Sequence, residues 1–162
     1  MERRTVIRAG LAGALLLTAG GAALLAGRDA RRDRATVLAA IVPAVLDGAL
    51  PVGATARSGA TARCLESVGT AISRLAPHAQ RDLDRLFALL ASAPGRRLLA
   101  GVAADWPDAT PAEVGAFLQS WRLHRLPALR AAYSALHDLV LGAWYADPST
   151  WSGIGYDGPV LA

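Results

Sequence analysis

The sequence is poor in the residues that build disulfides and metal sites. It has a single cysteine, Cys64, so no disulfide can form within the chain. The apolar neighbours of Cys64 predict a buried, inert thiol, and a linkage to a partner chain is the less favoured alternative. The three histidines, His78, His124 and His137, include no pair spaced three or four residues apart, which argues against a metal site.

Catalytic patterns are scarce as well. His137 follows Tyr133 by one turn, and His124 lies close behind Trp121, so we expect neutral histidines at the edge of the core rather than catalytic bases. No serine or threonine follows a predicted strand, as a nucleophile elbow requires. The glycines of residues 153–158 have the spacing of a dinucleotide fingerprint, but no strand precedes them and no helix can follow. The sequence therefore does not predict an enzyme.

The body of the chain has no excess of charge of either sign. The formal net charge is +4, and residues 1–34 alone carry it, with seven arginines and three acids. Residues 35–162 have ten of each and sum to zero. A neutral body lacks the basic surface that binds phosphate backbones, so we expect no nucleic-acid partner.

The first part of the chain predicts a targeting or membrane segment, which we place at residues 1–33. Arg3 and Arg4 form a pair, and residues 9–27 then run for 19 residues without a charge. Such a helix would be roughly 28 Å long, close to the thickness of a bilayer core. Its leucines stand among alanines and glycines, a mild composition that favours an export signal over a dedicated anchor.

Residues 2–8, Glu-Arg-Arg-Thr-Val-Ile-Arg, resemble a twin-arginine (Tat) signal, of which the pair Arg3-Arg4 is the strictest match. The resemblance implies that the Tat translocase exports the protein after it has folded. No small-x-small cleavage site follows, because Leu24 occupies the third position before a cut after Ala26. The sequence leaves two outcomes open, a signal that is cut and one that stays uncut and anchors the chain through residues 9–27. An ordinary single-pass anchor is the alternative to a Tat signal.

Apolar residues then recur at helical spacing, and no segment alternates as a half-buried strand would. We expect an all-α fold, with one domain of about five or six helices at residues 34–146. Asp33 is expected to cap the first helix and Pro43 to kink or break it. Further helices are expected after Gly59 and closed by Pro77, around residues 81–90, over 95–104 behind a Ser92 cap, from Thr110 and from Pro127. The buried face of the second helix is expected to carry Cys64, Val68 and Ile72, and that of the third Leu83, Leu86, Phe87 and Leu90. Thr110 and Glu113 are expected to form a capping box.

The last part, residues 147–162, is expected to be an irregular tail. Residues 144–156 hold four of the nine aromatic side chains in the chain, together with Pro148 and two glycines. Pro and Gly disfavour a helix there, so the aromatic rings must lie on an apolar surface, either of the chain itself or of a partner.

Several features of the second half resemble one family of proteins. They are Phe117 to Arg122, Arg130, Tyr133, Leu136, Leu139, Ala143 to Tyr145, Pro148, Trp151, Gly155-Tyr156 and Gly158-Pro159. This pattern resembles the small subunits of membrane-associated flavin-dependent sugar and alcohol dehydrogenases, the gluconate 2-dehydrogenase subunit 3 type. Family tails have proline where this chain has Asp157.

The resemblance implies an accessory subunit without a cofactor or chemistry of its own. Its partner would be a large FAD-dependent dehydrogenase of the glucose-methanol-choline type, with or without a cytochrome c subunit. The complex would be periplasmic, and the contact residues would be Trp144, Tyr145, Trp151, Tyr156 and Pro159. The alternative from another class is a free-standing periplasmic or membrane-anchored helical protein that binds a small apolar ligand.

Overall fold

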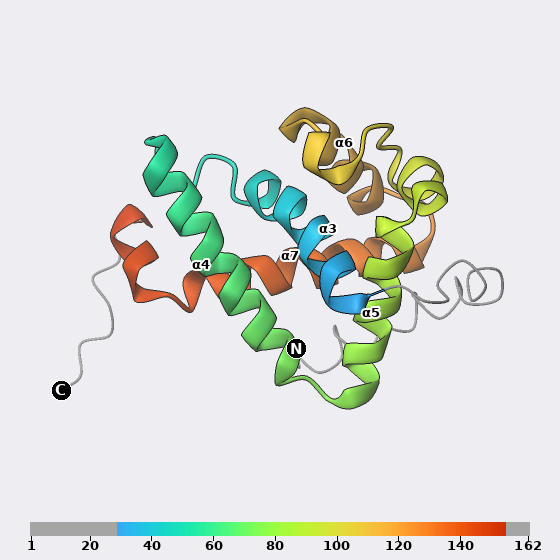
Figure 1. The fold of residues 1–162 in the computed structure, drawn as a ribbon, viewed down its shortest axis with the longest axis horizontal. Helices are drawn as coiled ribbons and strands as arrows, with labels where there is room; N and C mark the ends of the chain where they lie inside the picture. The colour runs from blue at the N-terminus through green and yellow to red at the C-terminus, as the bar shows by residue number, and fades with distance from the viewer. Residues whose placement is uncertain (1–28, 155–162) are drawn as a thin grey trace.

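The structure, a computed structural model, describes residues 29–154, and these residues form helices without a strand (Figure 1). The fold is therefore all-α, as predicted. Five α-helices are joined by a π-helical turn, η2, and two 3₁₀ segments, η3 and η4. Their bounds are α3 Ala30–Val45, α4 Ala54–Ser73, α5 Pro77–Ala91, η2 Gly95–Ala100, η3 Trp106–Asp108, α6 Pro111–Arg122, α7 Pro127–Tyr145 and η4 Pro148–Ile154.

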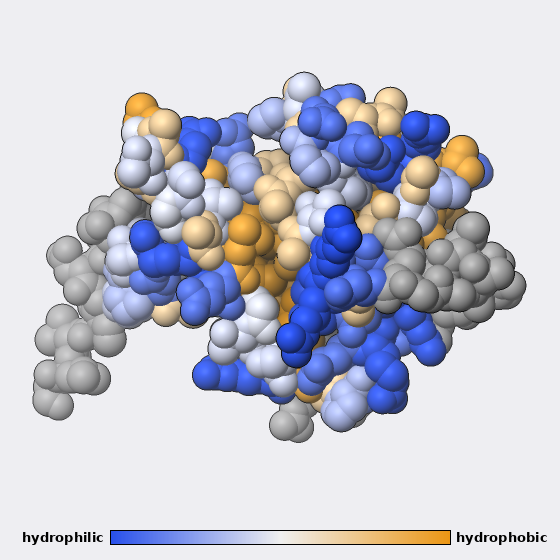
Figure 2. Space-filling model, viewed as in Figure 1, coloured by the Kyte–Doolittle hydropathy of each residue, from blue (hydrophilic) through white to orange (hydrophobic). Residues whose placement is uncertain are grey.

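The first of these helices, α3, forms the centre of the molecule and contacts all four other α-helices. Val37, Leu38, Ile41 and Val42 lie on its buried face. In Figure 1, α7 crosses behind α3, with α4 on one side and α5 on the other. Viewed as a surface, the same face shows apolar residues in the middle, between α4 and α3, and a hydrophilic rim (Figure 2). One core thus holds the whole described chain together.

The start of α3 differs from the prediction. The cap is Asp29, whose carboxylate accepts hydrogen bonds from the backbone N–H groups of Arg31 at 2.9 Å and Arg32 at 3.2 Å. Asp33, the predicted cap, is a buried residue within the first turn. Either aspartate satisfies the rule for a cap, and the upstream one lengthens the helix by a turn. Arg34 then forms an ion pair with Asp84 of α5.

Pro43 does not break α3, which continues to Val45. A proline in a helix removes one hydrogen bond and crowds the carbonyl four residues before it. Only two helical residues follow Pro43, so the proline disturbs few hydrogen bonds of α3. The chain then turns through Gly48, whose φ of 81° is in the region that glycine adopts most readily.

The next two helices agree with the predicted faces and differ at their ends. Cys64, Val68 and Ile72 lie on the buried face of α4, but the helix begins at Ala54, within the predicted loop. Pro77 opens α5 and does not close α4, because proline is well suited to the first turn of a helix. The predicted face of α5 is confirmed, with Leu83, Leu86, Phe87 and Leu90 all buried.

The predicted helix over residues 95–104 is shorter than expected and π-helical, ending at Ala100. Ser92 lies at its start, where its hydroxyl accepts a hydrogen bond from the N–H of Gly95 at 3.1 Å. Gly95 is required by space, since a Cβ there would lie 1.9 Å from the carbonyl oxygen of Leu89. Leu98 on this turn is 83% exposed, unlike the buried Val102 that follows it.

The capping box at Thr110 is confirmed. The hydroxyl of Thr110 accepts a bond from the N–H of Glu113 at 3.2 Å, and the Glu113 carboxylate accepts one from the N–H of Thr110 at 2.9 Å. The α6 helix that follows buries Phe117 and Trp121, whose rings meet edge to face with centroids 4.9 Å apart. The indole N–H of Trp121 donates to the carbonyl of Leu99 at 2.9 Å and so connects α6 to η2.

Within residues 29–154, no helix is long and apolar enough to cross a membrane. The predicted span at residues 9–27 and the export pair Arg3 and Arg4 lie outside the described residues. The helical body begins at Ala30, four residues before the expected boundary, and helical structure continues past the other boundary into η4. The expectation that the tail cannot be helical is therefore wrong for residues 148–154.

Candidate functional site

Three of the residues proposed to bind a partner, Trp144, Tyr145 and Trp151, lie at the end of α7 and on η4. Trp144 is buried in the core of this chain, whereas its neighbour Tyr145 is 43% exposed. Adjacent positions on a helix point about 100° apart, which explains how one ring is inside and the next outside. Trp151 is half-buried on η4. Tyr156 and Pro159 lie outside the described residues.

A turn after α7 brings Trp151 back toward Tyr145. Asp147 starts the turn, and its carboxylate accepts a hydrogen bond from the N–H of Ser149 at 2.9 Å. This is an Asx-turn, which places the backbone of Pro148 in a bend. The indole N–H of Trp151 then donates to the carbonyl of Tyr145 at 2.8 Å. An end carbonyl of α7 that has no partner within its own helix is thereby satisfied.

Thr150 fixes this turn from the inside. It is one of few buried polar residues, and its hydroxyl lies 3.0 Å from the carbonyl oxygen of Trp144 and 2.8 Å from that of Asp147. A hydroxyl has one proton, so it donates to the two carbonyls in turn. The positions of Tyr145 and Trp151 are therefore set by backbone hydrogen bonds on both sides of the turn.

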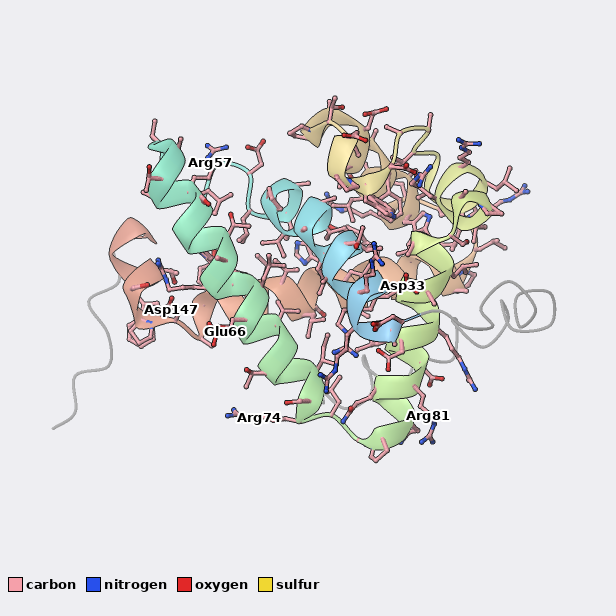
Figure 3. The ribbon with its side chains drawn as sticks, viewed as in Figure 1. Asp33, Arg57, Glu66, Arg74, Arg81 and Asp147 are labelled. Atoms are coloured by element: carbon pink, nitrogen blue, oxygen red, sulfur yellow. The ribbon has the colours of Figure 1, made fainter. Side chains whose placement is uncertain are left out.

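An ion pair connects the turn to α4. Nε of Arg63 lies 3.6 Å from the Asp147 carboxylate, which Figure 3 shows beside α4. The pKa of Asp147 is lowered, first by the hydrogen bonds from Ser149 and also by the positive charge of Arg63. Asp147 therefore stays ionised near neutral pH and keeps both contacts.

Cys64, the residue after Arg63, confirms the prediction of a buried thiol. Its Sγ lies 4.0 Å from the carbonyl oxygen of Val140 on α7. Burial, and secondarily the negative charge of Asp147, raise the pKa of the Cys64 thiol to about 11. The thiolate is the reactive form, so this group is inert at neutral pH.

A shallow groove of about 430 Å³ runs between α4 and α7, next to the turn. Small residues of α7 form its floor, and charged residues stand at its edges, among them Glu66 and Arg74, which Figure 3 marks along α4. The lining consists of Glu66, Ser67, Thr70, Ala71, Arg74, Asp138, Leu139, Gly142, Ala143 and Ala146. Ala146 follows Tyr145 directly in the chain, so one end of the groove lies at the residue next to the exposed Tyr145.

A second, more apolar pocket of about 300 Å³ lies between α3, η3 and α6. Alanines and prolines make most of its wall, and Trp106 closes it from below with its indole N–H bonded to the carbonyl of Leu90 at 2.8 Å. The lining consists of Thr36, Ala39, Ala40, Pro43, Ala44, Trp106, Pro107, Ala109, Pro111 and Val114.

The histidines have local contacts. Nδ1 of His124 accepts a hydrogen bond from the N–H of Leu126 at 3.0 Å. The ring of His137 stacks on Tyr133 with centroids 5.3 Å apart, and its Nδ1 lies 3.5 Å from the Asp138 carboxylate. Among the residues that the structure describes, no three His, Cys, Asp or Glu side chains are grouped as metal ligands.

The sequence prediction missed the residues that hold the aromatic pair in place, Arg63, Asp147 and Thr150. The signal was present in part, because Asp-Pro-Ser-Thr is a sequence that favours an Asx-turn. The pairing of Arg63 with Asp147 depends on the packing of α4 against α7 and has no local signal.

Fold and site together define a small helical protein with a fixed aromatic edge at its C-terminal end. No protein-family model matches the chain, and no curated protein or solved structure matches it either.

Proposed function

We propose that this chain is the non-catalytic small subunit of a membrane-associated, FAD-dependent sugar or alcohol dehydrogenase. In this proposal it escorts the large flavoprotein through the Tat pathway and stabilises it in the periplasm, where the uncut leader anchors both. The large subunit supplies the FAD. The resemblance of the second half to such small subunits and the pair Arg3-Arg4 support this function from the sequence.

The observation that carries the proposal is the aromatic pair at the end of α7, the exposed Tyr145 and the half-buried Trp151. Tyrosine and tryptophan are enriched where partners contribute most to binding. The hydrogen bonds of Thr150 and of the Trp151 indole hold the two side chains in place before any partner arrives. A contact surface that is already ordered loses less conformational entropy on binding. Tyr156 and Pro159 follow within a few residues and extend the same aromatic segment.

Trp144 has a different place in this proposal. Because its ring is buried in the core, it supports Tyr145 from behind and does not itself contact a partner. A Trp144→Ala variant should therefore destabilise the chain, by about 3 to 5 kcal/mol as for other buried large-to-small changes. The same replacement of an aromatic residue on the surface would reduce the stability of the chain much less.

The test is co-purification from membranes through a tag at Ala162. The double variant Tyr145→Ala, Trp151→Ala should lose the flavoprotein and its FAD absorbance, while circular dichroism shows the helical body intact. Val52→Ala is the matched control, because Val52 is 97% exposed and apolar but belongs to the connection between α3 and α4. Recovery of the same flavoprotein with the double variant would move the contact elsewhere on the helices. Recovery of no flavoprotein with the unchanged chain would refute the function.

The pocket between α3, η3 and α6 favours the second candidate, a protein that binds a small apolar ligand. Its volume of about 300 Å³ is at the lower end of the range for ligand sites, and its lining is mostly apolar. An environment-sensitive apolar dye should then bind the purified chain, and Ala40→Phe should abolish binding by filling the pocket. A dye signal that is equal in both chains would exclude the pocket as the site.

A further inference from the structure

Large apolar side chains are exposed at the end of the molecule opposite the aromatic pair. The described surface has five strongly exposed large hydrophobics, and three of them are leucines near η2 and the connection from α6 to α7. Leu98 is 83%, Leu123 78% and Leu126 52% exposed. Scattered single leucines need no explanation, but three on neighbouring segments of the fold call for one.

The hydrogen bond from Trp121 to the carbonyl of Leu99 joins the two neighbouring segments that carry the leucines, η2 and the end of α6. Leu98 precedes Leu99, and Leu123 lies two residues beyond Trp121 at the end of α6. Leu126 then caps the start of α7, and the bond from its N–H to His124 keeps the connection tight.

Arginines surround these leucines. Arg97, Arg122 and Arg125 are exposed, and Arg130 fixes the connection by donating to the carbonyls of His124 at 2.8 Å and Arg125 at 3.3 Å. We call the three leucines with Arg97, Arg122 and Arg125 the basic leucine edge.

Carboxylates are almost absent from this region. The sequence has no Asp or Glu between Glu113 and Asp138, nor between Asp84 and Asp105. Asp105, the acid closest to η2 in sequence, forms an ion pair with the buried Arg96. The basic leucine edge therefore has few carboxylates among its neighbours in the sequence, although the body as a whole is neutral.

We infer that the basic leucine edge rests on an anionic lipid surface. The arginines would contact the headgroups, and the leucines would lie at the boundary between the headgroups and the acyl chains. Segments that bind at a membrane surface typically combine exposed leucines with arginines. The free energy gained by burying the leucines adds to that of attracting the arginines to anionic lipid. A protein partner for this surface would have to be strongly acidic. The inference rests on the proposed function in one respect, the anchoring of the chain at a membrane.

The position of the edge suits such an anchor. Arg34, near the start of α3, pairs with Asp84 in the middle of α5, and α5 leads directly to η2 (Figure 1). From the rise of a helix, the chain enters the body within roughly 25 Å of η2. A body held by residues 9–27 could thus lay this edge on the same membrane.

The experiment uses the full chain reconstituted alone in vesicles, with a fluorophore sensitive to polarity attached at Leu123→Cys. Cys64 is buried and stays unlabelled, which the unchanged chain verifies. Val52→Cys is the matched control, an exposed apolar position on the connection between α3 and α4. Vesicles of phosphatidylcholine with phosphatidylglycerol are compared with vesicles of phosphatidylcholine alone, and Leu126→Cys repeats the measurement.

The label at Leu123 should shift to the blue and be quenched by nitroxide lipids in the vesicles with phosphatidylglycerol only, while the label at Val52 stays in water. Adding Arg122→Gln and Arg125→Gln should abolish the shift without changing the circular dichroism spectrum. A label at Leu123 that stays in water, or labels that respond equally at both positions, would overturn the inference. A label that shifts only after the flavoprotein is added to the same vesicles would overturn the inference and assign the edge to a protein partner.

These results are separate from the test of the proposed function. A chain that recovers the flavoprotein but keeps Leu123 in water would refute only the lipid contact. A chain that places Leu123 in lipid but recovers no flavoprotein would refute only the dehydrogenase role.

Discussion

Gly95 provides the sharpest test of the structure, because it has almost no room for a side chain. A Cβ at this position would lie 1.9 Å from the carbonyl oxygen of Leu89, 2.8 Å from its carbon and 2.9 Å from the hydroxyl of Ser92. The two nearest atoms belong to the backbone, so no side-chain rotation can relieve the clash. Gly95→Ala must therefore displace either the end of α5 or the start of η2.

The displacement would affect two contacts that follow Gly95 in the chain. Arg96 forms an ion pair with Asp105, and the carbonyl of Leu99 accepts the hydrogen bond from the indole N–H of Trp121. Loss of one hydrogen bond to a buried group costs about 1 to 3 kcal/mol, and overpacking costs about the same again. We therefore expect Gly95→Ala to lower the free energy of unfolding by about 2 to 4 kcal/mol, without changing the charge or the helix content by much.

The same substitution at Gly69 is the control, with the opposite expected sign. Gly69 lies within α4, and a Cβ there would meet nothing within 4 Å. Alanine in a helix interior is more favourable than glycine by about 0.5 to 1 kcal/mol, so Gly69→Ala should stabilise the chain. Urea denaturation followed by circular dichroism measures both free energies. If Gly95→Ala unfolds at the same urea concentration as the unchanged chain, the close approach of Gly95 to Leu89 is wrong.

Three further predictions concern the capping box, the export signal and the response to pH. Thr110→Ala should cost about 1 kcal/mol, because it removes the N-cap bond of α6, and an unchanged thermal midpoint would disprove that bond. Replacing Arg3 and Arg4 by lysine should leave the protein in the cytoplasm, as cell fractionation would show, and unchanged delivery to the periplasm would exclude the Tat route. Glu113 and Asp147 have lowered pKa values, through hydrogen bonds from Thr110 and from Ser149 respectively. A carboxyl whose pKa is lower in the folded state contributes stability above its unfolded pKa, so acid titration from about pH 5 downward should destabilise the chain. Glu113→Gln should weaken that loss, and a pH profile identical to that of the unchanged chain would contradict the capping contact.

The faces of the helices could be predicted from the sequence, but their ends could not. Leu83, Leu86, Phe87 and Leu90 were predicted to be buried because their spacing depends only on the helical repeat. The ends depend on choices between near-equal signals. Asp29 and Asp33 are both good caps, and Pro77 can either end one helix or begin the next. Packing of the next segment decides between such options.

The candidate site, too, could be predicted only in part from the sequence. The aromatic character of the segment after residue 144 could be predicted from composition, yet its division into a buried Trp144 and an exposed Tyr145 could not. That division follows from how α7 lies on α4, which local pattern does not contain. The 3₁₀ segment η4 was missed because Pro148, read as a stop signal, also starts a new turn.

Three of the four tryptophans use their indole N–H in the same way. Trp106 donates to Leu90, Trp121 to Leu99 and Trp151 to Tyr145, each time to a backbone carbonyl earlier in the chain. The three bonds close loops of different length, and closing a longer loop costs more chain entropy. The bond of Trp151 therefore closes its loop at the smallest entropic cost and the bond of Trp121 at the largest, so the long loop depends most on the packing of the core around it.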